Sequence, residues 1–301
     1  MSALIHQSLL DTVRRHADSS FDSQGICATS VPGLFAIRAT RPSEITFSID
    51  RPLVAMILQG RKCVISGNTS LEFGAGESLM ISADIPTISQ ITTASVATPY
   101  YSLVFEIDIV TVEELVQKME AAPAISHRPV LVDETETEVA EAALRLMKLN
   151  TRPSALPVLK DQMARELHYW LLAGRHGNML RSLGVVESHA RRVARAVGVI
   201  RSNYKAPLRV EQLAEAAGMS PSAFHQHFRA ITSLTPLQFV KRLRLIEARR
   251  MMFAEGAGAS HAAYAVGDES VPQFNREYRR LFGQPPIRDL KSAQSRAAFA
   301  A

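Results

Sequence analysis

The spacing of apolar residues divides the chain into a β-rich part and a helical part. From about residue 25 to residue 105, short runs of β-branched and aromatic residues alternate with turn residues, a pattern typical of strands. The strand candidates are 45–49, 54–58, 62–66, 78–82, 87–92 and 100–105. Many short strands at regular spacing indicate a β-barrel or a double-sheet jelly roll. After Val112 the apolar residues recur at helical spacing, interrupted by a polar connector at 174–184, so we expect helices to the end of the chain.

This pattern predicts an α+β chain with two domains. The 301 residues, 47% of them hydrophobic, are enough to bury two cores. We place a β-barrel or jelly roll with flanking helices at 1–185. The all-α remainder, 186–301, is expected to hold two helix-turn-helix units at about 208–231 and 259–282, joined by a long helix.

The first unit has the turn chemistry of a helix-turn-helix. Gly218 suits a left-handed helix end, and Ser220 and Pro221 are placed to begin the next helix. Phe224 and Phe228 lie on one face of that helix and are predicted to be core. The opposite face is polar, as in a recognition helix that contacts base edges in the major groove. The base-contact candidates are Ser222, His225 and Gln226, and the phosphate-contact candidate is Arg229.

The same pattern returns 49 residues later at Gly267. Ser270 and Gln273 are spaced as a capping box, and Phe274 begins the same aromatic spacing as in the first unit. Arg276 is the strongest candidate for base recognition, because a guanidinium can pair with both O6 and N7 of guanine. The base-contact candidates are Gln273, Asn275 and Arg276, and the phosphate-contact candidates are Arg279 and Arg280.

A basic helix is predicted between the two units. Thr235 can cap a helix that begins at Pro236 and ends near Ala254. A helix of about 19 residues spans nearly 30 Å, close to the roughly 34 Å between successive major grooves, so one chain could contact two half-sites. Its basic residues are expected to face solvent or DNA phosphate. They are Lys241, a further phosphate-contact candidate, and Arg242, Arg244, Arg249 and Arg250.

Charge separates the two parts of the chain in the same way. From Ala190 onward there are 18 Lys and Arg against eight Asp and Glu, a net charge of +10, whereas the preceding part carries −5. Lys and Arg gain free energy by displacing counterions from phosphates. The alternative is a solvated basic surface, but two units of the same type joined by a basic helix favour DNA binding.

The C-terminal residues resemble the DNA-binding domain of the AraC/XylS family of bacterial transcription regulators. The family's second unit ends in an aromatic and basic stretch before Gly-x-x-Pro, which stands here at 274–286 as FNREYRRLFGQPP. The likeness runs from about Arg191 to Leu290 and implies binding to double-stranded promoter or operator DNA. Two positions depart from the pattern: Asp268 replaces an aromatic residue, and Pro272 stands one position later than usual.

The N-terminal part resembles the cupin-like sensor domain of one AraC branch. The likeness is carried by the stretches that begin at Pro52, Leu71 and Pro157. It implies a cupin-like barrel at 1–185 that binds a small-molecule effector. It leaves open whether this domain forms a homodimer and whether the protein contacts RNA polymerase.

A cupin-like metalloenzyme is the competing class of function. Cupin enzymes hold their metal through His and Glu, but the sequence has no His between His16 and His127. We therefore predict no catalytic residue, no metal and no cofactor. A third alternative, a barrel that serves only to dimerise a DNA-binding protein, stays open.

Three residues of the β-rich part are candidate sensor residues. Cys63 follows Arg61 and Lys62, and nearby cations favour a reactive thiolate, so Cys63 is a candidate redox or electrophile sensor. An inert cysteine on a strand is the alternative. Tyr100 and Tyr101 are candidate effector contacts, although aromatic residues on a strand are more often core.

The sequence also predicts a cytoplasmic protein. Its two cysteines, Cys27 and Cys63, cannot make a disulfide framework and fit a reducing compartment. The first residues lack the apolar stretch of a signal peptide. No apolar run approaches the roughly 20 residues needed to cross a bilayer, so we expect no membrane partner.

Overall fold

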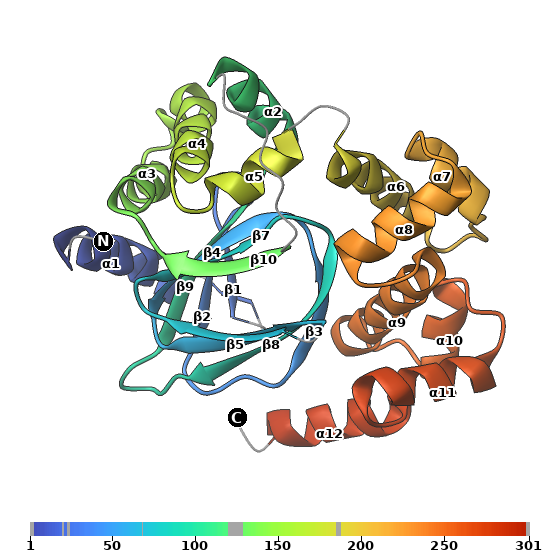
Figure 1. Cartoon of the computed structure of the whole chain (residues 1–301). Coiled ribbons are helices and arrows are strands. Elements are labelled where there is room, and N and C mark those ends of the chain that lie inside the picture. The colour runs from blue at the N-terminus through green and yellow to red at the C-terminus, as the bar shows by residue number, and fades with distance from the viewer. Residues whose placement is uncertain are drawn as a thin grey trace. The chain divides into compact units, whose positions relative to one another are not determined.

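The computed structural model describes residues 3–19, 21–22, 25–67, 69–119, 129–184 and 188–298, with side chains to residue 292. The chain forms two compact units, Met1–Arg191 and Arg192–Ala301, which are described one at a time (Figure 1). The domain boundary that the sequence predicts, between residues 185 and 186, falls at 185–187, outside the described residues.

The N-terminal unit, called the β unit from here on, contains two antiparallel sheets. One has six strands in the order β1-β2-β9-β4-β7-β10, and the other has four in the order β3-β8-β5-β6. Figure 1 shows the two sheets facing each other. The strands are β1 Ile26–Ala28, β2 Leu34–Ala39, β3 Thr46–Asp50, β4 Leu53–Gln59, β5 Arg61–Ser66, β6 Thr69–Gly74, β7 Glu77–Ile81, β8 Ile85–Thr93, β9 Tyr100–Glu106 and β10 Val130–Glu134.

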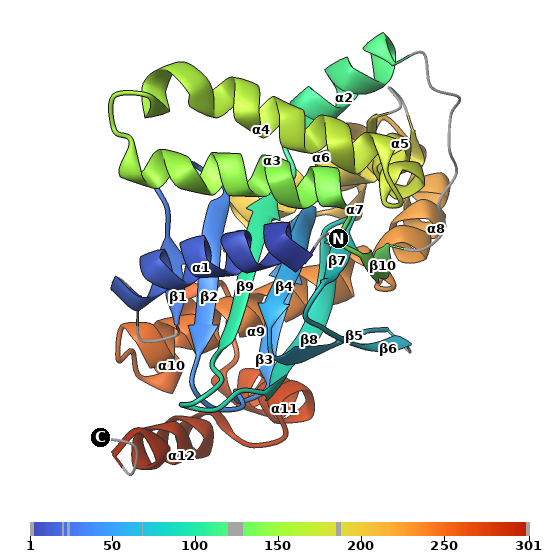
Figure 2. The same ribbon diagram turned by 90° about the vertical axis from the view of Figure 1, so that its left-hand side faces the viewer.

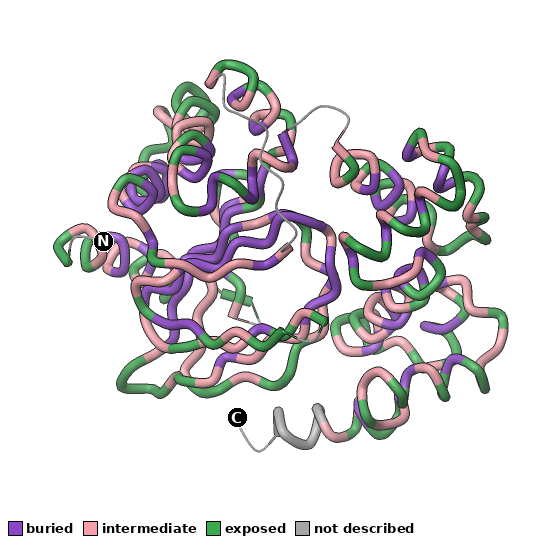
Figure 3. Tube along the Cα trace, viewed as in Figure 1, coloured by how far each residue is buried: buried purple, intermediate pink, exposed green. Residues whose placement is uncertain are grey.

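Helices cover the outer face of the six-stranded sheet, and α1 lies across its strands (Figure 2). The central strands β4 and β9 are apolar almost throughout and largely buried, as expected for strands covered on both faces. Alternate β9 residues, among them Leu103 and Phe105, pack with the helices in one apolar core. Figure 3 shows buried residues on the sheet and on the helix faces that meet it. The helices are α1 Ala3–Ser19, α2 Ile109–Lys118, α3 Thr137–Met147, α4 Leu156–Ala173 and α5 Gly177–Gly184, with a 3-10 turn η1 at Lys148–Thr151.

Two sequence-based expectations for this unit are wrong. Strand β10 lies well beyond the predicted β-rich region and extends the six-stranded sheet beside β7. The expected connector at 174–184 contains helix α5. Its glycines allow close packing instead of ending a helix: a Cβ on Gly184 would lie 2.7 Å from Cγ2 of Val116 in α2. A glycine that serves as a contact point has no distinct signature in a single sequence.

The described residues of the C-terminal unit form helices joined by turns and short loops. One apolar core cluster of this unit contains Phe274 and Tyr278. The predicted α+β class, with a β unit followed by a helical unit, is confirmed. No helix in the described part of the chain is long and apolar enough to cross a membrane. The helices are α6 His189–Asn203, α7 Val210–Ala216, α8 Pro221–Thr232, α9 Pro236–Ala254, α10 Ala259–Ala265, α11 Val271–Phe282 and α12 Pro286–Ala298.

Candidate nucleic-acid interface

Helices α7 and α8 form the first helix-turn-helix unit. Gly218 has a φ of 62°, a left-handed conformation that glycine adopts readily. Two hydrogen bonds close the turn, from the Gly218 N–H to the Glu215 carbonyl at 2.8 Å and from the Met219 N–H to the Ala214 carbonyl at 2.9 Å. Ser220 then caps α8, where its hydroxyl accepts from the Ala223 N–H at 3.4 Å.

Helices α10 and α11 form the second unit with the same turn. Gly267 has a φ of 82°, and its N–H donates to the Tyr264 carbonyl at 3.0 Å. The Asp268 N–H donates to the Ala263 carbonyl at 3.0 Å. Both bonds therefore repeat those of the first unit at a separation of 49 residues. The departure from the family pattern at Asp268 leaves this turn geometry unchanged.

The second turn is one residue longer before its helix cap. Ser270 caps α11 by accepting from the Gln273 N–H at 3.4 Å. The predicted capping box would return a bond from Gln273 to the Ser270 N–H, but Asp268 accepts that N–H at 3.1 Å. The Gln273 side chain instead donates to Glu277 at 3.4 Å. Asp268 therefore satisfies the helix terminus that the extra residue would otherwise leave open.

Both recognition helices bury an aromatic pair and present a polar face. The ring centroids of Phe224 and Phe228 lie 5.3 Å apart in α8, and those of Phe274 and Tyr278 lie 5.6 Å apart in α11. The predicted contact residues lie on the opposite faces. Those that are exposed are Ser222, His225, Gln226 and Arg229 in α8, and Gln273, Asn275, Arg276, Arg279 and Arg280 in α11.

Arginines of the preceding helices bind the two turns. Arg192 in α6 donates to the Ala217 carbonyl of the first turn at 2.9 Å. Arg244 in α9 donates to the Gly267 carbonyl of the second turn at 2.9 Å. The same guanidinium donates to the carbonyls of Tyr204 at 2.6 Å and Ala206 at 2.9 Å. Arg244 therefore fixes the second turn to the segment that follows α6.

The basic residues of α9 are less available to DNA than the sequence predicts. Arg244 is committed to backbone carbonyls, and Arg249 donates to Asp289 at 2.8 Å. Arg250 pairs with two acidic neighbours in its own helix region. Lys241, the phosphate-contact candidate, is exposed but donates to Glu277 at 2.7 Å. Helical spacing shows which residues leave the core, but not which of them meet a carboxylate or a carbonyl.

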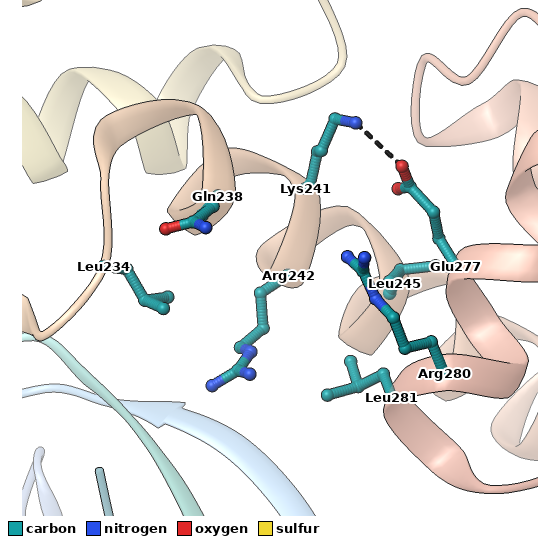
Figure 4. Close-up of a pocket in the computed structure, with 8 residues that line it drawn as sticks. All are labelled: Leu234, Gln238, Lys241, Arg242, Leu245, Glu277, Arg280 and Leu281. Atoms are coloured by element: carbon teal, nitrogen blue, oxygen red, sulfur yellow. Dashed lines mark hydrogen bonds and ion pairs between the residues drawn. The ribbon is translucent and has the colours of Figure 1, made fainter.

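Arg242 keeps an unpaired guanidinium and lies in a pocket of about 200 Å³ between α9 and α11 (Figure 4). It has no hydrogen-bond or ion-pair partner among the described residues. Burial, followed by the like charge of Arg280 in the same pocket, lowers the pKa of Arg242. Two guanidinium groups in one pocket can accommodate a phosphate. Arg242 is therefore a phosphate-contact candidate that sequence analysis did not separate from its neighbours.

A buried carboxylate holds the end of the second unit together. Asp289 at the start of α12 accepts from Arg249 and from the Tyr278 hydroxyl, each at 2.8 Å, and from Gln284 at 2.9 Å. Burial alone would raise the pKa of Asp289, but the hydrogen bonds from Arg249 and Tyr278 outweigh it and hold the pKa below its ordinary value. Tyr278 also belongs to the aromatic pair of α11, so this network supports the recognition helix.

The sensor candidates of the β unit fall in different environments. The Cys63 sulfur lies 3.4 Å from the Ser70 hydroxyl near the surface, while Arg61 pairs with Glu72. Tyr101 is buried and donates to Asp18 at 2.8 Å, whereas Tyr100 is fully buried beside the Ser102 side chain. The described residues contain no group of three or more His, Cys, Asp and Glu that could hold a metal ion.

Taken together, the geometry defines a helix-turn-helix protein with two units of the same type and a cupin-like β unit. Family models agree with this class. The model for the AraC-type transcriptional regulator N-terminus matches residues 30–179, and a helix-turn-helix domain model matches residues 213–292. The chain belongs to the AraC family of transcriptional regulators.

Individual relatives share limited identity with the chain. The transcriptional activator RhaS of Pectobacterium carotovorum is 28% identical over 90 residues, which is 30% of this chain and 32% of that protein. ArgR of Pseudomonas aeruginosa is 26% identical over 108 residues, 36% of this chain and 33% of that protein. The matched stretch thus spans about a third of the length of these curated relatives.

Solved structures extend the likeness over both units at the level of the fold. ToxT from Vibrio cholerae is 12% identical, with a TM-score of 0.60, over 85% of this chain and 97% of that one. At this identity the match shows a shared fold, the cupin-like unit followed by the helix-turn-helix helices.

Proposed function

We propose that the chain regulates transcription by binding promoter DNA through α8 and α11, under the control of a small effector bound by the β unit. The observation that carries the proposal is the repeated unit: two turns with the same hydrogen bonds, each followed by a helix with a buried aromatic pair and an exposed polar face. Helix α9 has 19 residues and thus spans nearly 30 Å. That length suits two recognition helices in successive major grooves.

The proposed base contacts favour the second unit. Arg276 is exposed and has no side-chain partner among the described residues, so it can approach a guanine edge without breaking an internal bond. In the first unit, Ser222, His225 and Gln226 have less pairing capacity with guanine. We expect α11 to contribute more base discrimination than α8. Arg229, Arg242, Arg279 and Arg280 would neutralise backbone phosphates, and Lys241 would do so only by leaving Glu277.

The effector proposal has a separate basis. The β unit matches the N-terminal model of the AraC-type regulators, and ToxT, which shares the fold, has been solved with an unsaturated fatty acid bound. We propose that the β unit of this chain also binds a small molecule. Homodimerisation, contact with RNA polymerase and the cytoplasmic location stay predictions, as does Cys63 as a redox sensor.

The DNA proposal is tested by comparing two arginines of the same helix. Genomic fragments bound by the protein are selected first, and affinities are then measured on a selected fragment and on random DNA at several salt concentrations. Arg276→Ala should cost about 1–3 kcal/mol on the selected fragment and little on random DNA. Arg279→Ala should weaken both alike and reduce the salt slope by about one.

The control is Arg15→Ala, which removes one exposed positive charge from the β unit and should leave both affinities unchanged. Equal losses for Arg276→Ala on selected and random DNA would show that Arg276 does not contact a base. A chain that binds no genomic fragment would contradict the proposed function itself.

A further inference from the structure

Lys62 lies on the inner side of the β unit. In β5 it pairs with Phe73 of β6 and with Ile91 of β8, and both partners are buried. Paired residues of antiparallel strands project to the same face. The neighbouring Cys63 projects to the opposite face, near the exposed Ser70 hydroxyl. Its buried strand partners therefore place Lys62 on the inner face of the four-stranded sheet, and Figure 1 shows the two sheets facing each other.

The ammonium of Lys62 has no hydrogen bond or ion pair with any described residue. Lys62 is half-buried, and protein surrounds its ammonium on most sides. Burial lowers the pKa of Lys62, and Asp50 opposes this effect from a distance. The Asp50 carboxylate is itself hydrogen-bonded to Thr87. An enclosed and unpaired ammonium costs free energy in the absence of an anion.

Two buried hydroxyl groups lie close to each other on the facing sheet. The Tyr100 hydroxyl and the Ser102 Oγ interact with each other, and neither makes a full hydrogen bond to a described residue. In β9 they alternate with Tyr101 and Leu103, which pack with the helices, so Tyr100 and Ser102 point to the inside of the unit.

The Tyr100 ring lies at the end of the unit where β5 begins. A Cβ on Gly60, which connects β4 to β5, would lie 3.0 Å from Cδ2 of Tyr100. Lys62 follows two residues after Gly60. Burial raises the pKa of Tyr100 well above its ordinary value, which keeps its hydroxyl protonated and able to donate. Native proteins rarely leave buried polar groups unsatisfied, and each such group calls for a partner.

We propose that Lys62, Tyr100 and Ser102 bind the carboxylate group of a small molecule with an apolar carbon skeleton. The ammonium would pair with the carboxylate, and the two hydroxyls would donate to it. The inward-facing Phe73 and Ile91 would pack against the carbon skeleton. The inference rests on the proposed function, in which the β unit holds the effector, and it names the chemical class of that effector. It also distinguishes Tyr100 from Tyr101, whose hydroxyl already has Asp18 as its partner.

The test uses the full chain and matched pairs of ligands. Hexanoate, decanoate, benzoate and phenylbutyrate are each compared with their primary amide by thermal shift and calorimetry. We expect at least one carboxylate to bind with no comparable binding of its amide. Lys62→Met should reduce that affinity roughly ten- to a hundredfold, and Tyr100→Phe should reduce it by a smaller factor. Lys148→Met, which removes an exposed lysine of the same unit, should change nothing.

A second measurement needs no ligand. Removing an enclosed and unpaired ammonium should raise the melting temperature of Lys62→Met above that of the wild type and of Lys148→Met. The proposal is overturned if amides bind as well as carboxylates, if no carboxylate binds, if Lys62→Met retains the affinity, or if Lys62→Met melts lower than Lys148→Met. DNA affinity of the ligand-free variants is measured in parallel. Carboxylate binding without any DNA binding would contradict the proposed function and leave this site intact.

Discussion

The two turn glycines have similar backbone angles but different surroundings, so the same substitution should have unequal effects. At Gly218 an added Cβ would meet nothing closer than a guanidinium nitrogen of Arg192, at 3.5 Å. At Gly267 it would lie 2.0 Å from the Lys205 carbonyl oxygen. That carbonyl belongs to backbone next to Tyr204, which Arg244 holds by a hydrogen bond, so it cannot move without disturbing other contacts.

The expected magnitudes follow from these distances. Placing alanine in a left-handed conformation lowers the free energy of unfolding by about 1–2 kcal/mol. Alanine also restricts the unfolded chain more than glycine does, which offsets about 0.4–1 kcal/mol of this loss. Gly218→Ala should therefore destabilise its unit by roughly 0–1.6 kcal/mol. Gly267→Ala adds the cost of steric overlap, about 1–3 kcal/mol, for a total of roughly 1–4.6 kcal/mol.

Hydrogen–deuterium exchange can assign each effect to its own unit. Peptides from 210–232 should exchange faster in Gly218→Ala, and peptides from 259–282 should exchange much faster in Gly267→Ala. Gly198→Ala is the control, because Gly198 is an exposed residue inside α6 with open space around it. This change should stabilise α6 by about 0.5–1 kcal/mol. Equal protection losses at Gly218 and Gly267 would refute the steric argument.

Three further predictions concern the second unit and the β unit. Asp289→Asn should cost about 1.5–3 kcal/mol in urea unfolding, because it removes the charge that Arg249 binds. Since the pKa of Asp289 is held below its ordinary value, the wild type has this stability above about pH 4 and loses it as the pH falls further, whereas the variant should lack that acid-dependent loss. Arg244→Met should cost about 2–4 kcal/mol by removing three bonds to carbonyls, and exchange should rise around Gly267; unchanged protection there would contradict the assigned role. Cys63→Ser should leave the effector response in a reporter assay unchanged if Cys63 is inert, and a lost response would establish it as a sensor.

The local features of the helix-turn-helix units were predictable because their chemistry is contained within a few residues. Left-handed turns require glycine, helix starts require a capping hydroxyl, and buried aromatic residues four apart define one helix face. Gly218, Ser220 and Phe224 express all three in the first unit. These rules define the exposed faces of α8 and α11 independently of tertiary contacts.

Features that depend on distant partners were not predictable in the same way. Strand β10 is defined by its pairing with β7, about 50 residues earlier in the chain, and its own five residues have no strong periodic pattern. In the sequence Lys62 is an ordinary lysine of a strand, beside Cys63. Only the register with Phe73 and Ile91 shows that Lys62 faces the inside of the β unit. In the sequence Asp268 is only a departure from the family pattern, whereas in the structure its side chain caps the longer turn.

The basic helix α9 shows how tertiary contacts decide which charges can serve in recognition. Arg244 already donates to the Gly267 carbonyl and Arg249 to Asp289. Arg242, in contrast, has no partner in the pocket beside Arg280. The net positive charge thus overstates the number of cations available to DNA phosphates, because an arginine that donates to backbone carbonyls cannot also neutralise a phosphate at the same geometry. Arg242, Arg276, Arg279 and Arg280 lie on or beside α11, and this supports our expectation that the second helix-turn-helix unit contributes more to DNA recognition than the first.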